Sequence, residues 1–433
     1  MFRSDGPYTE RIRFGGLVGV GLALATIVVV QGATLTVTAR NTRVKRAGNR
    51  FIKTYRGNVR VWDSSRRLSA RRATYNDHLG VAWLAGNVQI VEKGRTMFAD
   101  SVVYWPSDPH RRGDGALVRL IGSVSLKDTN RTLWADTLTY RPDLKWGEAK
   151  GRVRVIGDGQ TVEANRALYD DRAGTLIAEG AVMLADSAES TIVRGKRIVF
   201  EPDRNEALIT GRPMLSRGSP DGTLEVEGDT MRLSGADTSR QASVWGGVTI
   251  TRGLLHATCD SLRLNQAAGR LWLRGRPQAI HNTEEKDGRT RSVVLGERMD
   301  VFLHKDMRIR QIEVVGRAEG TAVETDEAGE VSGEGWVVGK SIAFSIDEDQ
   351  VTGLRVVGTA RSWFRPADTN EFNEASGDTI QLGFEDGRMR SVNIRGGVQG
   401  LYRTPTDTTG GLRRSSDVSV FGKTGLTQGV AQC

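Results

Sequence analysis

The chain of 433 residues carries 61 Lys and Arg against 52 Asp and Glu, which gives a formal net charge of +9. Its 38% hydrophobic and 26% charged residues exclude a disordered or low-complexity chain. The 52 glycines against 10 prolines indicate many tight turns and favour β-structure. The positive charge suits nucleic acid, a membrane surface or a phosphorylated glycolipid and does not choose among them.

An uncharged apolar segment of about seventeen residues runs from Phe14 to Val30. Arg3, Arg11 and Arg13 precede it, so the segment predicts an export signal or a membrane anchor. Cleavage after the small residues within it would leave an apolar stub, which favours an uncleaved anchor. The basic residues that follow outnumber those that precede, which runs against the positive-inside rule for an exported body.

A short pattern returns from Gly57 onward at intervals of about 30 residues. Its first half is glycine, any residue, valine, any residue and an apolar residue. This half begins at Gly57, Gly86, Gly122, Gly151 and Gly180. Its second half is apolar, any, small, polar, any, apolar, any and aromatic. This half is clearest in Leu133-Trp-Ala-Asp-Thr-Leu-Thr-Tyr140. It occurs about ten times between Leu68 and Leu382.

The alternation within each repeat predicts strands with one apolar face. Val59 and Val61 would share that face, because successive side chains of a strand point to opposite sides. Among Leu133, Ala135 and Leu138 the apolar spacing changes from two to three, which predicts a bulge or bend. One repeat cannot bury its apolar face alone, so we expect stacked repeats with a shared interior.

The chain therefore divides into five predicted parts. We expect an all-β fold over residues 51–403. Charged, glycine-containing stretches at 277–291, 319–335 and 365–377 are expected as protruding loops. The other predicted parts are a cytoplasmic stub over 1–13, a transmembrane signal-anchor helix over 14–33, a basic linker over 34–50 and a flexible tail over 404–433.

Catalytic and metal-binding patterns are missing from the sequence. The five histidines are scattered singly, and no nucleophile elbow or phosphate loop is present, so we expect no enzyme activity, no metal and no cofactor. Cys259 stands where other repeats have Ala or Gly, which favours a buried apolar role over a disulfide with Cys433. The recurring Asp100, Asp136 and Asp229 are interpreted as solvated positions beside a bend, with a row of calcium ligands as the alternative.

The glycine and small-polar repeats, with the apolar N-terminal segment, resemble the OstA-type family of lipopolysaccharide-transport proteins, which includes LptA, LptC and the N-terminal domain of LptD. The resemblance covers Phe51 to Tyr402. It implies an extended open β-jelly roll whose interior holds the acyl chains of lipopolysaccharide. A helix before the roll is similar to LptC, although the chain carries about twice the repeats of an ordinary LptA or LptC.

The resemblance also implies partners and a location. These are lipopolysaccharide or a similar glycolipid, an inner-membrane ABC transporter complex and other jelly-roll Lpt-type proteins, joined by edge-to-edge strand pairing. The chain would be a single-pass protein of the bacterial inner membrane, held by its N-terminal helix, with its bulk in the periplasm. No nucleic acid is expected, because an export segment argues against it.

The candidate lipid-binding residues are the apolar positions of the clearest repeats. They are Val59, Val61, Val88, Ile90, Leu133, Leu138, Tyr140, Val153, Val155, Val162, Tyr169 and Val182. The same alternation fits a solidly packed core, so a structural or scaffold protein of the envelope without a ligand is the alternative. A β-helical enzyme acting on polysaccharide would need a cluster of carboxylates in one groove, and no such cluster is visible in the sequence.

Overall fold

The computed structural model describes residues 36–403, apart from 106–116, 236–240, 367–371 and stretches of one to three residues at other turns, and residues 418–421. The fold is nearly all β, with antiparallel strands, which confirms the predicted class. The predicted stub and membrane helix, residues 1–33, lie outside the described residues. Within the part of the chain that is described, no helix has the length and hydropathy needed to span a membrane.

The described residues form two compact units. Unit 1 contains those of Met1–Arg217 and Arg232–Asp237, and unit 2 contains those of Gly218–Met231 and Thr238–Cys433. The strands of unit 1 are β1 (Thr36–Thr38), β2 (Asn41–Ala47), β3 (Arg50–Trp62), β4 (Arg66–Asn76), β5 (Val81–Glu92), β6 (Arg95–Trp105), β7 (Leu117–Lys127), β8 (Arg131–Arg141), β9 (Trp146–Gly157), β10 (Gln160–Asp170), β11 (Thr175–Asp186), β12 (Thr191–Glu201), β13 (Glu206–Thr210) and β14 (Met214–Arg217). Strand β16 (Thr230–Ser234) has residues in both units.

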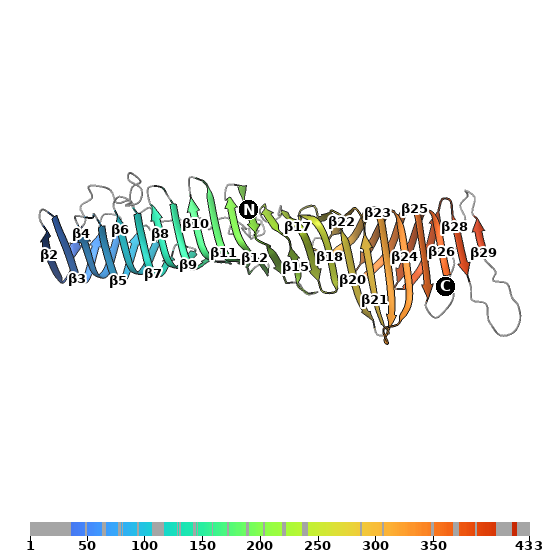
Figure 1. Cartoon of the computed structure of the whole chain (residues 1–433), viewed down its shortest axis with the longest axis horizontal. Coiled ribbons are helices and arrows are strands. Elements are labelled where there is room, and N and C mark those ends of the chain that lie inside the picture. The colour runs from blue at the N-terminus through green and yellow to red at the C-terminus, as the bar shows by residue number, and fades with distance from the viewer. Residues whose placement is uncertain are drawn as a thin grey trace, which may run out of the picture. The chain divides into compact units, whose positions relative to one another are not determined.

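The strands of unit 1 follow one another side by side in chain order (Figure 1). From β3 to β12 each strand pairs antiparallel with its chain neighbours. The ladder begins with β1 and β2, which both pair with β3. The predicted basic linker over 34–50 is therefore wrong in part, because backbone pairing continues through its charged sequence.

A sharp corner interrupts the strands that carry the Gly-x-Val pattern. In β7 the φ angles of Gly122 and Ser123 are 77° and 45°, so both lie in the left-handed region that favours glycine. These two residues face Asp136 alone on β8, which makes a bulge. The same pair of positive φ angles recurs at Gly57–Asn58, Gly86–Asn87, Gly151–Arg152, Gly180–Ala181 and Gly211–Arg212. The predicted bend is confirmed, and the extra residue lies on the glycine strand.

The polar residue of each small-polar pair covers the outside of the next corner. A Cβ added to Gly151 would collide with Asp136, and one added to Gly122 would collide with Asp100. Arg152 also donates to Asp136, with 2.6 Å between Nη2 and Oδ1. The aspartates therefore stand beside a bend as interpreted from the sequence, and they require glycine in the neighbouring strand.

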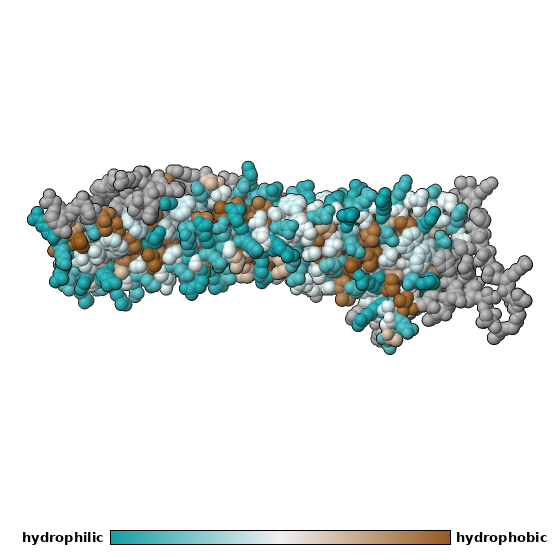
Figure 2. Space-filling view, in the orientation of Figure 1, coloured by the Kyte–Doolittle hydropathy of each residue, from teal (hydrophilic) through white to brown (hydrophobic). Residues whose placement is uncertain are grey.

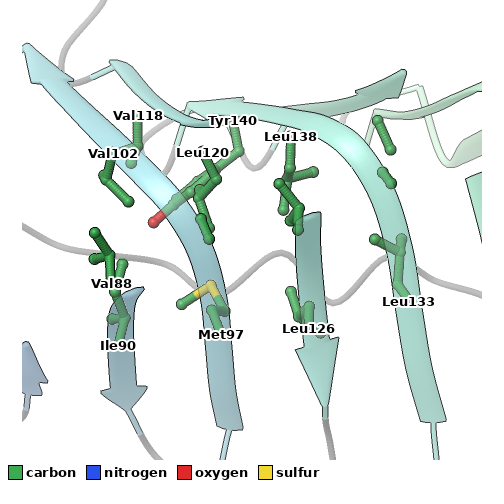
Figure 3. Packing of buried hydrophobic residues seen from close by; sticks show 14 of the residues in the cluster. Val88, Ile90, Met97, Val102, Val118, Leu120, Leu126, Leu133, Leu138 and Tyr140 are labelled. Carbon is green, nitrogen blue, oxygen red and sulfur yellow. The ribbon is translucent and has the colours of Figure 1, made fainter. Parts of the chain in front are cut away.

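The corners fold the sheet of unit 1 into two facing arms. Arm A contains the strand halves that include Leu117–Ile121 of β7 and Thr137–Arg141 of β8. Arm B contains the other halves, including Val124–Lys127 and Arg131–Ala135. Figure 3 shows Val102, Val118, Leu120, Leu138 and Tyr140 of arm A above Val88, Ile90, Met97, Leu126 and Leu133 of arm B. The core of unit 1 therefore lies between the arms.

Unit 2 repeats the bent-strand pattern. Its strands are β15 (Leu224–Glu227), β17 (Gln241–Arg252), β18 (Leu255–Asn265), β19 (Arg270–Arg274), β20 (Gln278–Glu285), β21 (Gly288–Leu295), β22 (Arg298–Leu303), β23 (Ile309–Asp326), β24 (Val331–Asp347), β25 (Gln350–Pro366), β26 (Phe372–Glu385), β27 (Arg388–Arg395), β28 (Gln399–Arg403) and β29 (Val418–Phe421). At some corners the two halves of a bent strand are separate short strands, as β19 and β20 are around Gly275.

Two of the predicted protruding loops are hairpins of the sheet. Strands β20 and β21 pair from Gln278–Leu295 to Glu285–Gly288, and β23 and β24 pair beyond their corner to Thr325–Val331. The loop prediction for 277–291 and 319–335 is wrong, because backbone hydrogen bonds extend the ladder where the apolar alternation has faded. In the predicted tail, Val418–Phe421 likewise pairs with β28.

Candidate functional site

The interior between the arms of unit 1 is the candidate site, because most of the predicted lipid-binding residues converge there. We call this set the interior cluster. It contains Val88, Ile90, Leu133, Leu138, Tyr140, Val153 and Val155, with Val162 and Tyr169 packed against it. The structure therefore brings together residues from β5, β8, β9 and β10 that the sequence assigned to one face.

Three predicted residues lie outside the interior cluster. Val59 and Val182 are buried to 1% exposure on β3 and β11, in line with the predicted facing. Val61 is half-buried near the end of β3, opposite Leu68. The predicted face is thus continuous from β3 to β11, although its members do not all touch one another.

The interior also contains residues outside the predicted lipid-binding set. They are Leu84, Met97, Val102, Val118, Leu120, Val124 and Leu126, with the small residues Ala70, Ala99, Ala135, Ala149 and Ala167. The same period of two on the facing strands is the signal that could have found them. The alanines sit near the corners, where the two arms meet.

The interior is densely packed. Leu120 and Leu138 are 0% exposed, and Tyr140 and Ile90 are 1% exposed. Side chains of arm A thus take the place that an acyl chain would occupy against arm B. Chemically the interior offers apolar surface, which suits a hydrocarbon and no charged group. Among the described residues no group of three or more His, Cys, Asp or Glu is placed to hold a metal ion.

Polar residues begin where arm B ends. Beyond Val162 and Leu184, the interior face continues with Gln160 and Asp186, which lie directly opposite each other on β10 and β11. Both are buried, at 6% and 8% exposure. The sequence analysis missed this pair, although its position follows from the same alternation.

The outer face of arm A carries a network of ion pairs. Glu148 bonds Arg166 at 2.6 Å and Lys150 at 2.9 Å, and Arg166 continues to Glu179, which also pairs with Arg197. Burial acts to raise the pKa of Glu148, but the hydrogen bonds from Lys150 and Arg166 outweigh it and leave that pKa below its ordinary value. Such a network keeps this face hydrated and distinguishes it from the interior.

Apolar and polar side chains are mixed on the outside. Trp83, Phe98 and Trp134 are 37%, 44% and 40% exposed, and Ser125 lies between the last two in the sheet. Figure 2 shows the same mixture, with apolar patches among hydrophilic residues on the visible face. The continuous apolar surface of unit 1 is therefore its interior.

In unit 2, Cys259 is free and buried next to a corner, as the alanine-like slot predicted. Its Sγ donates to the carbonyl oxygen of Ser261 at 3.3 Å. Burial raises the pKa of the Cys259 thiol to about 11. A thiol in this state packs as a small apolar residue, and Cys433 lies outside the described residues.

Comparisons with known proteins give a structural likeness to a solved periplasmic protein. No protein-family model matches the chain. No curated protein matches it. The chain is similar to LptH from Pseudomonas aeruginosa, the LptA homologous periplasmic component of the conserved lipopolysaccharide transport device, at 21% identity and a TM-score of 0.23. The match covers 26% of this chain and 81% of that chain. The functional conclusion therefore depends on the geometry of the interior.

Proposed function

We propose that the chain binds lipopolysaccharide or a related lipid and passes it across the periplasm to the outer membrane. The observation that supports this is the interior of unit 1. Its apolar face continues over many strands between two arms that are joined at glycine corners. Each methylene moved from water to such a surface contributes about 0.8 kcal/mol. Acyl chains would replace the contacts between the arms, while sugars and phosphates stay in water.

In this proposal the chain is anchored in the bacterial inner membrane by residues 14–33 and is not an enzyme. Its partners are an inner-membrane ABC transporter complex and other jelly-roll Lpt-type proteins. Strand β2 supports edge-to-edge pairing, because it pairs with β3 on one side and with no second strand among those that the structure describes. An edge strand offers unpaired N–H and C=O groups to a second sheet.

The alternative is a scaffold protein whose repeats are packed solid. The observation that favours it is the near-complete burial of Leu120 and Leu138 between the two arms. The two readings differ in one property, which is whether the arms of unit 1 separate to admit a lipid.

Photo-crosslinking distinguishes the two functions. A photoreactive residue is placed in turn at Leu138 and Val162, which face the interior, and at Thr139 and Thr161, their neighbours on the other face. In cells that make radiolabelled lipopolysaccharide, we expect labelled adducts at Leu138 and Val162 alone. Adducts at none of the four positions, in a folded protein, would favour the scaffold.

A substitution in the half-buried part of the interior gives a second test. Val162→Asp places a carboxylate among apolar side chains, and we expect at least a tenfold loss of lipid binding, which corresponds to about 1.4 kcal/mol. Thr161→Asp on the outer face is the matched control, with binding unchanged. Equal binding by both variants, measured on purified protein with labelled lipid, would place the lipid elsewhere.

A further inference from the structure

The interior face of unit 1 changes from apolar to polar at one row of residues. Gln160 and Asp186 share the face of the buried Val182 and Leu184, because they follow the same alternation along β10 and β11. Nε2 of Gln160 donates to Oδ2 of Asp186 at 3.1 Å. The pair lies about 6.6 Å along the strands from its apolar neighbours Val162 and Leu184.

This pair leaves an acceptor without a donor. Oε1 of Gln160 is buried and has no hydrogen-bond partner among the described residues. A buried polar atom in that state is unfavourable, and in folded proteins it commonly marks a place that water or a ligand completes. Since an amide oxygen only accepts hydrogen bonds, Oε1 of Gln160 calls for a donor.

The same row contains polar residues on both sides of the pair. Thr191 lies opposite Asp186, and Arg217 lies opposite Thr191. On the other side Gly157 lies opposite Gln160, and Arg131 lies opposite Gly157. The row therefore marks the level at which a lipid in the interior would change from hydrocarbon chain to polar head.

We propose that Gln160 and Asp186 form a hydrogen-bonding site for a hydroxyl or amide N–H that a bound lipid carries where its acyl chain joins the polar head. This inference rests on the proposed function. A chain lying against Val162 and Leu184 brings such a donor next to Oε1 of Gln160, while an unsubstituted chain leaves the acceptor unpaired. The site thus selects hydroxylated or amide-linked chains over plain hydrocarbon.

The test uses two probes that differ in one hydroxyl, methyl 3-hydroxymyristate and methyl myristate, and the purified full-length chain. We expect the hydroxylated probe to bind about tenfold more tightly, as one hydrogen bond to a buried acceptor provides. The double variant Gln160→Leu with Asp186→Leu should bind both probes equally, because it replaces the polar pair by apolar side chains of similar volume. Gln160→Met, which keeps Asp186, is a second variant in case the first does not fold.

Thr161→Val, on the opposite face of β10, is the matched control and should keep the tenfold preference. Equal binding of both probes by the unaltered chain would overturn the hydrogen-bonding site and leave the proposed function standing. A preference that survives in both variants would also overturn the site. Binding of neither probe, nor of lipopolysaccharide, by the folded chain would remove the proposed function and this inference with it.

Discussion

At the scale of single residues, the corners decide the fold of unit 1. Each needs two successive residues at positive φ, and only the first is always glycine in the copies that unit 1 contains. The second is Asn, Ser, Arg or Ala. The left-handed region costs an ordinary side chain about 1–2 kcal/mol. The glycine also leaves room for the polar residue of the preceding strand.

The corner of β11 allows a matched pair of substitutions. In Gly180→Ala the new Cβ would lie 2.9 Å from the Cβ of Asn165, at a φ of 76°, so we expect the free energy of unfolding to fall by roughly 2 kcal/mol. In Ala181→Gly the strained φ of 47° is relieved at an exposed position, so stability should be unchanged or up to ~1 kcal/mol higher. Chemical denaturation measures both, and an equal loss in the two variants would contradict this account of the corner.

The buried thiol gives a second prediction at this scale. Because burial raises the pKa of Cys259 to about 11, little thiolate forms at pH 8, and the folded chain should react slowly with a thiol reagent. The measurement is made on a Cys433→Ser variant so that Cys259 alone is counted. Rapid reaction before urea is added would show that the thiol is accessible.

At the scale of elements, the sequence predicted strands well where a buried face imposes a period of two. Leu133, Leu138 and Tyr140 point inward as expected, and Gly122-Ser123 marks the bend. The strand prediction failed for 277–291, because residues such as Arg289 and Arg291 pair through the backbone while their side chains stay exposed, so no burial creates a pattern. The contact between the arms could not be predicted either, since the alternation is the same for a packed core and for a lipid-lined trough.

Polar side chains also hold elements together, as Asp300 of β22 shows. It is 4% exposed and accepts hydrogen bonds from Arg274 at 2.6 Å and Arg270 at 2.8 Å on the neighbouring β19. Burial acts to raise the pKa of Asp300, but these two bonds outweigh it and leave the pKa below its ordinary value. The carboxylate therefore stabilises the folded state above the pH at which Asp ionises in the unfolded chain, about 3.9.

We expect Asp300→Asn to lower the stability of this part of the sheet by about 2 kcal/mol at pH 7, because two guanidinium groups lose a charged partner. As the pH falls below about 4, the unaltered chain loses this contribution through the folded pKa, so the difference between the two proteins should shrink. Hydrogen exchange of the β22 amides at pH 7 and at a pH below about 4 measures this difference in stability. A constant difference would show that the charge is not responsible.

At the scale of the whole molecule, the backbone pairing of the described strands begins after the predicted anchor. The first described strand begins at Thr36, and its pairing with β3 is made by residues after the predicted anchor. We expect a chain that lacks residues 1–33 to be soluble and to give a β-rich circular dichroism spectrum. A helical spectrum, or protein that stays in the insoluble fraction, would count against the architecture.

Between β3 and β12 the ladder of unit 1 is built by chain neighbours, since each inner strand pairs with those before and after it in the chain. A gene that gains or loses one hairpin would therefore keep every other pairing and the same interior cross-section. Each hairpin adds two strand spacings, about 9.6 Å of interior. Duplication of a single hairpin would therefore change the length of the interior in fixed steps without requiring a new fold.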